Sequence, residues 1–282
     1  MGVKGKMTTH LGRFGGFSRV VRGISMKVIK VNLDKNIKQL KIIPLSDVHL
    51  GDKLTNYKLL KECIERIKTE PNTYTIINGD FCNTAIKNSK SDIFSDELTP
   101  MEQLRQMIDL LEPIKDKILA ITTGNHERRI QNDTSIDITY LVAKQLNILD
   151  RYSNGWWYLF LRFGEKKDGR KIPMCYQITG YHGSGGGRKT GGKANRLEEM
   201  SQVVIADLYI MSHTHKPLST KSNIFIPDYG NNTLNKKQMH FLMTNSFLDY
   251  GGYGEVLGFT PTDNTPTEAL LDGSKRNIKI II

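Results

Sequence analysis

The pattern of apolar and polar residues differs between the two halves of the chain. In the first half, short apolar runs typical of strands alternate with segments whose apolar residues recur at helical spacing. In the second half, strand-like runs dominate. Helices and strands that alternate and then give way to strands predict a layered α/β fold, a two-sheet β-sandwich flanked by helices.

The predicted helices carry distinct signals. The apolar residues of 56–69 recur at helical spacing and predict an amphipathic helix. Thr99, Pro100 and Glu102 combine a capping box with proline at the first helical position, which predicts a helix from there to about residue 117. Further helices are expected over 136–149 and from about residue 194.

The strands are predicted from apolar runs that either alternate with polar residues or are continuous. An Asp168-Gly169 pair predicts a hairpin turn between two of them. The predicted strands are 26–33, 40–45, 74–78, 118–122, 156–163, 172–179, 208–211, 223–226, 240–243 and 278–282. The segment 247–267 is compatible with a lid, a partner-binding loop or a plain connection.

The charge of the chain is strongly basic, and it changes the expected partners. The 282 residues carry a formal net charge of +11, which favours polyanions such as nucleic acid. Much of the excess lies in the first 35 residues, where Asp34 is the only acidic one. We expect residues 1–24 to form a flexible basic arm, either solvated or in contact with nucleic acid, and 25–282 to form the folded domain.

The sequence gives no sign of export or of a membrane span. No apolar run approaches the length of a membrane-spanning helix, and the N-terminus lacks the apolar stretch of a signal peptide. Three cysteines without metal-ligand spacing argue against a disulfide framework. We therefore expect a cytoplasmic protein without a membrane partner; the sequence leaves its oligomeric state open.

Polar side chains with metal-binding chemistry follow five of the predicted strands. Because loops at the carboxyl ends of parallel strands meet at one crevice, these side chains are expected to converge. Asp47-x-His49 and His213-x-His215 have a spacing that, on an extended backbone, puts both side chains on one side. The candidate ligands are Asp47, His49, Asp80, Asn125, His182, His213 and His215.

This ligand set predicts two transition-metal ions rather than magnesium or calcium. Carboxylate, amide and imidazole donors suit Mn²⁺ best, with Fe or Zn²⁺ as alternatives. Asp80 lies alone at its strand end beside a glycine and suits a carboxylate that bridges two metals. Two such ions, roughly 3.5–4 Å apart, can activate water and clamp a phosphoryl group.

In this order, D-x-H, G-D, G-N-H-E, H and H-x-H resemble the signature of the calcineurin-like metallophosphoesterases, over residues 40–218. The resemblance implies the family's four-layer α/β/β/α fold and a hydroxide between the two metals as the nucleophile. It implies that one metal is held by Asp47, His49, Asp80 and His215, and the second by Asp80, Asn125, His182 and His213. It also implies that His126 is catalytic without binding metal, and that it protonates the leaving oxygen or stabilises the charged transition state.

Two positions depart from the family pattern. Ser212 replaces the glycine that usually precedes H-x-H, a change between small residues that should be tolerated. Asn83 stands where the protein phosphatases of this superfamily carry a second Asp. Together with Ser46-Asp47-Val48-His49, which looks like the opening motif of the repair nucleases, Asn83 favours the phosphodiesterase and nuclease branch.

Basic residues near the predicted centre are candidates for substrate binding. The glycine-rich loop that starts at His182 carries Arg188 and Lys189, and Arg196 follows in the next helix. Arg128 follows the G-N-H-E motif. The alternative for the loop is a solvated surface segment, and Trp156 to Tyr158 are more compatible with core and edge positions than with base stacking.

The sequence therefore predicts a phosphodiesterase or nuclease with two metals that acts on nucleic acid. A monoesterase acting on small phosphates or phosphoproteins shares the same metals and is the first alternative. The second is a binding module that keeps the fold without catalysis, although such modules typically lose metal ligands and none is missing here.

Overall fold

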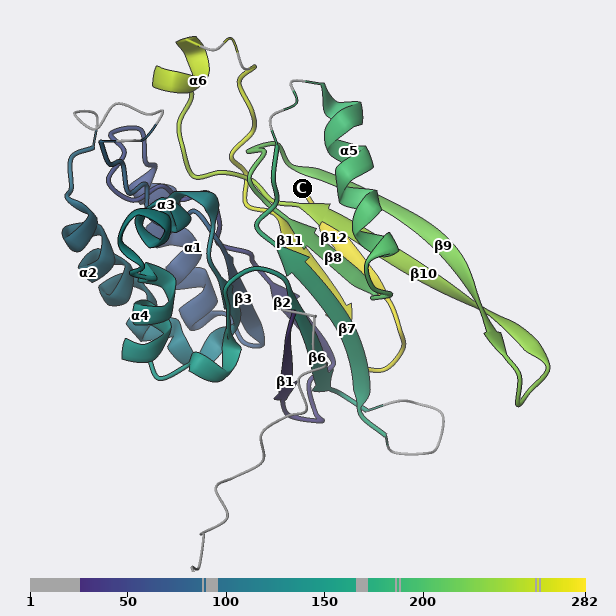
Figure 1. The fold of residues 1–282 in the computed structure, drawn as a ribbon. Helices are drawn as coiled ribbons and strands as arrows, with labels where there is room; N and C mark the ends of the chain where they lie inside the picture. The colour runs from purple at the N-terminus through teal and green to yellow at the C-terminus, as the bar shows by residue number, and fades with distance from the viewer. Residues whose placement is uncertain are drawn as a thin grey trace, which may run out of the picture.

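The computed structural model describes residues 26–87, 89, 96–165, 172–185, 187, 189–256, 258 and 260–282. The predicted N-terminal arm, the Asp168-Gly169 turn and Arg188 lie outside these residues. Within them, the strands form two mixed sheets of six strands each (Figure 1).

The first sheet has the order β1-β6-β7-β8-β10-β9. Its strands are β1 (Lys27–Asn32), β6 (Trp157–Phe163), β7 (Met174–Tyr181), β8 (Leu208–Met211), β10 (Thr233–Met243) and β9 (Leu218–Asp228). The second sheet has the order β12-β11-β2-β3-β4-β5. Its strands are β12 (Ile278–Ile281), β11 (Glu268–Asp272), β2 (Gln39–Ile42), β3 (Thr73–Asn78), β4 (Ile118–Thr122) and β5 (Tyr152–Ser153).

The helices cover the two outer faces of the sandwich. Figure 1 shows α1 to α4 on the side of the second sheet and α5 on the side of the first. The α-helices are α1 (Tyr57–Thr69), α2 (Pro100–Leu111), α3 (Asn125–Thr134), α4 (Ile138–Gln145), α5 (Thr190–Glu199) and α6 (Gly252–Val256). Short 3₁₀ helices are η2 (Glu112–Lys117), η3 (Leu149–Arg151) and η4 (Met200–Gln202).

Three layers of apolar side chains hold these four layers of secondary structure together. On β3, Ile77 packs toward the helices while its neighbour Ile76 packs between the sheets. On β8, Ile210 lies between the sheets and Tyr209 lies in the outer cluster beneath α5. Because side chains alternate along a strand, each sheet is buried on both faces, and the predicted helix-flanked sandwich is confirmed.

Local signals explain where several helices begin and end. Thr99 and Glu102 form the predicted capping box at the start of α2. The prediction of a single helix to residue 117 is wrong, because Pro113 has no N–H to continue the α-helical ladder and a 3₁₀ helix follows instead. The predicted helix over 56–69 is confirmed as α1, which Asn56 caps, and α5 begins at Thr190 rather than near residue 194.

The strand directions place the polar strand ends at one edge. β2, β3 and β4 run parallel to one another, as do β7 and β8. The carboxyl ends of these five strands are followed by the segments that carry the candidate ligands. The predicted convergence of strand ends therefore holds in both sheets.

We predict that Leu159→Ala lowers the free energy of unfolding by about 2–5 kcal/mol, because this β6 side chain is fully buried between the sheets. Chemical denaturation of the purified variant measures the loss. The matched control is Leu149→Ala in η3, where the leucine is 36% exposed and the expected change is within about 0.5 kcal/mol. Equal losses in the two variants would contradict the assignment of the central core.

Candidate metal centre

Five of the seven candidate ligands have a backbone in the left-handed region. The φ angles are 50° at Asp47, 55° at His49, 49° at Asp80, 71° at His213 and 54° at His215. The expectation of an extended backbone through Asp47-x-His49 and His213-x-His215 is therefore wrong. Non-glycine residues with positive φ are uncommon and cluster at functional sites, where the surrounding structure enforces them.

Asp47, His49 and His215 form one group of facing donor atoms. Their ligand atoms lie within 4.8 Å of one another, although His215 comes from the opposite sheet. Nε2 of His215 is 3.3 Å from Oδ1 of Asp47 and 3.2 Å from Nε2 of His49. Asp47 is held in place because its carboxylate accepts the backbone N–H of His213 at 2.9 Å.

Asp80, His182 and His213 form a second group with the same spacing. Nε2 of His182 lies 3.0 Å from Oδ2 of Asp80 and 3.0 Å from Oδ1 of Asn125, so Asn125 joins this group. A third group of donor atoms unites Asp80 with His49 and His126. Asp80 therefore has ligand atoms of His182 and His213 on one side and of His49 on the other, and its role as a bridging carboxylate stays a prediction.

The histidine tautomers leave lone pairs directed into the centre. Nδ1 of His49 faces Oδ1 of Asn83 at 3.1 Å, and Nδ1 of His182 faces the carbonyl oxygen of Asn78 at 2.9 Å. Because these oxygens only accept hydrogen bonds, each Nδ1 carries a proton. Once neutral, each ring presents the lone pair of its Nε2 to the carboxylates and to the other histidines.

The electrostatics of the centre favour the binding of a cation. Burial lowers the pKa of His182, but the Asp80 and Asp47 carboxylates outweigh it and raise that pKa to about 10. Burial and the neighbouring histidines lower the pKa of His49 well below its usual value, so this ring is neutral. Buried oxygens and a neutral imidazole facing one another fit divalent metal ions, which neutral His and carboxylate ligands bind.

Glycine allows the strand ends of β3 and β4 to approach each other. A Cβ on Gly124 would lie 2.1 Å from Oδ1 of Asp80, and a Cβ on Gly79 would lie 2.6 Å from the Cα of Gly124. Gly79 also has a φ of 85°, which L side chains rarely adopt. The glycines of the G-D and G-N-H-E motifs are thus required by the close packing around Asp80.

Glu127 holds the two motif segments together, a role that the sequence did not reveal. Its buried carboxylate accepts backbone N–H groups of Asp80, Cys82 and Gly124 at 2.9–3.0 Å. Burial and the charge of Asp80 raise the pKa of Glu127 to about 7, while the N–H donors favour the ionised form. The capping box at the start of α3 was the available signal.

His126 lies beside the metal-binding groups and not within the second one. Its backbone N–H donates to Oδ1 of Asp80 at 2.8 Å, and its Nε2 is 3.8 Å from Oδ2 of Asp80. Nδ1 of His126 faces the carbonyl oxygen of Asn83 at 2.8 Å, so Nδ1 is protonated and Nε2 accepts a hydrogen bond from Arg129 at 2.8 Å. Burial lowers the pKa of His126.

The two departures from the family pattern have structural explanations. Oγ of Ser212 accepts a 2.7 Å hydrogen bond from the Asn78 amide, which also donates to the carbonyl oxygen of Tyr181. Asn83 accepts from His49 and donates to Asp96, so its amide orients the imidazole. Both residues position ligands through hydrogen bonds rather than facing the centre themselves.

The predicted substrate-binding residues occupy different surroundings. Arg128 donates to the carbonyl oxygen of Asn154 at 3.0 Å, and Arg196 donates to the carbonyl oxygen of Ser184 at 2.7 Å. Lys189 is exposed at the start of α5. Their roles in substrate binding stay predictions, as does that of Arg188.

Two basic residues outside that set lie closer to the centre. Arg129 reaches His126 because both face the same side of α3, three residues apart, whereas Arg128 does not share that side. Lys193 is buried and donates to the carbonyl oxygen of Thr214, between His213 and His215. A predicted helix from Asn125 would have distinguished Arg129 from Arg128.

The aromatic segment 156–158 is structural in part: Trp157 is buried between the sheets, and Trp156 stacks on Tyr181 with ring centroids 4.3 Å apart.

A family model for calcineurin-like phosphoesterases matches residues 40–250, which is most of the chain. The chain therefore belongs to the calcineurin-like phosphoesterase family. Together with the clustered histidines and carboxylates, this membership identifies a metal-dependent phosphoester hydrolase that binds divalent metal.

Comparison with curated proteins found no match. Among solved structures, a predicted phosphoesterase from Streptococcus pneumoniae TIGR4 is 14% identical, with 87% of this chain and 90% of that chain covered and a TM-score of 0.38. A metallophosphoesterase from Sphaerobacter thermophilus is 15% identical, with 83% and 84% covered and a TM-score of 0.35. GAP50 of Plasmodium, an anchor in the inner membrane complex, is 13% identical, with 86% and 84% covered and a TM-score of 0.44.

Each helix in the described part of the chain is too short or too polar to cross a lipid bilayer.

We predict that Gly124→Ala greatly weakens divalent-metal binding, because the added methyl group cannot fit against Asp80. Calorimetric titration with Mn²⁺, with unfolding monitored in parallel, measures the effect. Gly191→Ala in α5 is the matched control, since nothing lies within 4 Å of a Cβ there. Normal metal binding by the Gly124 variant would contradict the close packing of β3 and β4 at the centre.

Proposed function

We propose that this protein is a phosphodiesterase with two metal ions that cleaves nucleic acid. The observation that carries the proposal is the position of Asp80 between two groups of ligand atoms, Asp47 with His49 and His215, and His182 with Asn125 and His213. Two metal sites that share one carboxylate would place two ions close enough together to act on the same phosphoryl group. The O/N ligand set favours Mn²⁺, with Fe and Zn²⁺ as the alternatives.

Two features support a diester of nucleic acid as the substrate. Asn83 stands at the position where related protein phosphatases carry Asp, and its amide orients His49 without adding negative charge. The net charge of +11 favours a polyanionic substrate. The candidates for binding phosphates that flank the scissile bond remain Arg128, Arg188, Lys189 and Arg196.

Different residues of the chain would have separate roles in the reaction. Divalent ions bound there would supply Lewis acidity at the phosphoryl oxygens and would lower the pKa of water, so that hydroxide is available as the nucleophile. The two carboxylates and the neutral imidazoles hold and orient those ions. His126 holds a proton for the leaving oxygen, and for this role its Nε2 must be released by Arg129.

Arg129 provides a physical route to that release. It is the donor to Nε2 of His126, and its guanidinium also bonds Ser89. A substrate phosphate would compete for the guanidinium, because Arg binds phosphate through strong, charge-assisted hydrogen bonds. Substrate binding would then both fix the phosphate and free Nε2 of His126 for protonation.

We also propose that the metallophosphoesterase domain spans 25–282 and that the protein is cytoplasmic. The strands from β1 at Lys27 to β12 at Ile281 all belong to the two sheets, which supports a single domain. Cys63, Cys82 and Cys175 are free thiols, which suits a reducing compartment.

We predict Mn²⁺-dependent cleavage of labelled single-stranded DNA that is abolished by chelator and lowered at least 100-fold by Asp80→Asn. The loss follows because Asp80 belongs to one group of donor atoms with His182 and His213 and to another with His49 and His126. Gel analysis of the products measures cleavage, and Asp109→Asn on the surface of α2 serves as the control. A clear preference for monoesters would instead support the monoesterase, and absence of bound metal would support a binding module.

We predict that His126→Ala lowers the cleavage rate far more for diesters with alkyl leaving groups than for bis(p-nitrophenyl) phosphate. An alkoxide needs a proton as it leaves, whereas p-nitrophenolate does not, and general acid catalysis typically contributes about 10²–10⁴-fold. Steady-state rates on the two substrate classes provide the measurement. Equal losses on both would show that His126 does not act as the acid.

A further inference from the structure

The hairpin of β9 and β10 extends the first sheet beyond the sandwich (Figure 1). Leu242 of β10 packs in the core between the sheets, and we call the side of the first sheet on which it lies the inner face. Because side chains alternate along a strand, every second residue of β10 counted from Leu242 lies on this inner face. Past the sandwich, the inner face consists mainly of Lys221, Phe225, Leu234, Lys236, Gln238 and His240. We call this uncovered surface, with the adjoining part of β12, the hairpin groove.

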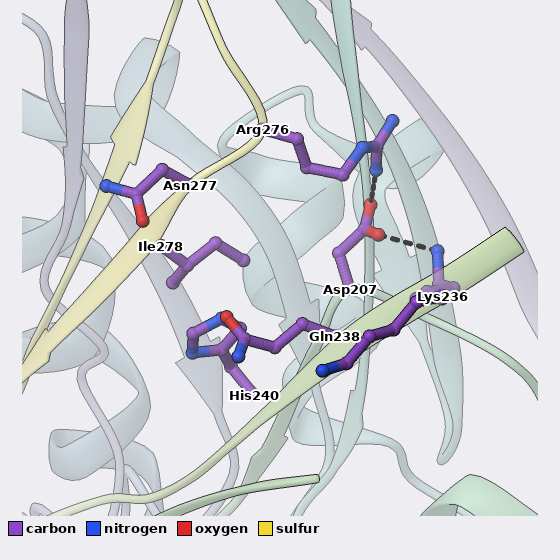
Figure 2. A pocket seen from close by; sticks show the side chains of 8 residues that line it. Asp207, Lys236, Gln238, His240, Arg276, Asn277 and Ile278 are labelled. Atoms are coloured by element: carbon purple, nitrogen blue, oxygen red, sulfur yellow. Dashed lines mark hydrogen bonds and ion pairs between the residues drawn. The ribbon is translucent and has the colours of Figure 1, made fainter. Parts of the chain in front are cut away.

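The groove is hollowed where the hairpin meets β12. A cavity of about 380 Å³ is lined by Lys236, Gln238 and His240 on one side and by Asn277 on the other (Figure 2). A neighbouring cavity of about 520 Å³ is lined by Lys221 and Lys279. Both cavities include His240, Asn277 and Ile278, so they form one continuous trough.

The trough carries positive charge that the described residues do not neutralise. Lys221, Lys236 and Lys279 are exposed, and within the described ranges none of them forms an ion pair with a carboxylate. Asp207 is the acidic residue that lines the first cavity, but it is buried and already paired with Lys237 and Arg276, as Figure 2 shows for the arginine. An anionic ligand would therefore meet lysines without competition from a free carboxylate.

Apolar side chains continue the groove along the hairpin. Phe225 is 60% exposed and Leu234 is 65% exposed, although both lie on the inner face of an ordered strand pair. Phe225 pairs across the hairpin with Lys236. An exposed aromatic ring beside lysines is the combination with which proteins bind single-stranded nucleic acid, by stacking a base while contacting the phosphates.

We infer that the hairpin groove binds a single strand of nucleic acid, in addition to the strand bound at the metal centre. Lysines contact the phosphates, Phe225 stacks on a base, and the amides of Gln238 and Asn277 form hydrogen bonds within the trough. A second copy of this chain fits less well, because two such faces would oppose lysines to lysines. A bilayer would not enter a hollowed trough to reach Asn277.

The groove lies at the far end of β8 from the metal centre. Asp207 precedes β8 and His213 follows it, which separates them by about 20 Å at about 3.3 Å per residue. The nucleic-acid substrate rests on the function proposed above, and the groove would bind parts of a long strand away from the cleaved bond. It should therefore increase affinity for long strands and leave the cleavage of small diesters unchanged.

The test is the binding of fluorescently labelled oligothymidylate to the full-length protein in EDTA, measured by anisotropy over a series of salt concentrations. The groove variant combines Lys221→Gln, Lys236→Gln and Lys279→Gln, and it spares Lys237 and Arg276 so that buried Asp207 keeps its partners. The matched control combines Lys58→Gln, Lys61→Gln and Lys144→Gln, which are exposed lysines of α1 and α4. Both variants keep the basic residues among 1–25, so any contribution of these residues to DNA binding is the same in both.

We expect the groove variant to bind the oligonucleotide at least tenfold more weakly at low salt. A plot of log affinity against log salt concentration should also become less steep, by about 2 in slope, because three phosphate contacts are lost. Phe225→Ala should weaken binding about fivefold or more. The control should bind like the unaltered protein. Equal binding by groove and control variants would overturn the inference, as would a groove variant that loses binding to phosphatidylserine vesicles but not to DNA.

Hydrolysis of bis(p-nitrophenyl) phosphate with Mn²⁺ separates this inference from the proposed function. The groove variant should retain the full rate on this small diester, and a matching loss there would mean that its centre is damaged and would count against a separate surface. If the unaltered protein binds DNA through the groove but cleaves none, the nuclease proposal fails while the groove stands.

Discussion

The buried carboxylates of Asp47 and Asp80 impose the constraint on which the rest of this structure depends. Both side chains are withdrawn from water, and both face Nε2 of His182, whose Nδ1 donates to the carbonyl oxygen of Asn78. Burying charge in this way is costly unless a cation compensates it. The loops, glycines and supporting hydrogen bonds at the strand ends can all be understood as means of assembling this anionic, donor-rich pocket.

The packing of the sandwich compensates for the backbone strain at the metal centre. Left-handed backbone at residues such as Asp47 and His213 costs about 1–3 kcal/mol each and persists only where the surroundings enforce it. The buried strands of both sheets and the three N–H groups bonded by Glu127 provide those surroundings. Because His182, His213 and His215 follow one sheet and the remaining ligands follow the other, the centre also depends on how the two sheets pack together.

Much of the fold and the members of the candidate centre could be predicted from the sequence, because both follow from local pattern. The ligands follow apolar strands directly, and β8 and β4 have the predicted bounds. Helix α3 was missed because Asn125–Thr134 is almost entirely polar, and β11 was missed although Glu268–Asp272 pairs with β2 inside the second sheet. The length of the β9 and β10 hairpin was underestimated because its polar, exposed half has no core to mark it.

The contacts that distinguish one basic residue from the next could not be predicted in the same way. Arg128 and Arg129 are adjacent in the sequence, yet only the helical register of α3 turns Arg129 toward His126. Likewise, Lys193 meets Thr214 only because α5 packs on the sheet beside β8. The contact of Lys193 depends on tertiary packing, which no local signal in the sequence encodes, whereas that of Arg129 depends on a helix that the sequence did not predict.

The proposed pairing of two metal ions around Asp80 is tested most directly by a crystal structure of the Mn²⁺-loaded protein, with anomalous difference maps collected near the manganese edge. Two peaks roughly 3.5–4 Å apart are predicted, one beside Asp47, His49 and His215 and the other beside Asn125, His182 and His213, with Asp80 contacting both. A single peak, or two peaks that do not share Asp80, would contradict a centre built on that carboxylate.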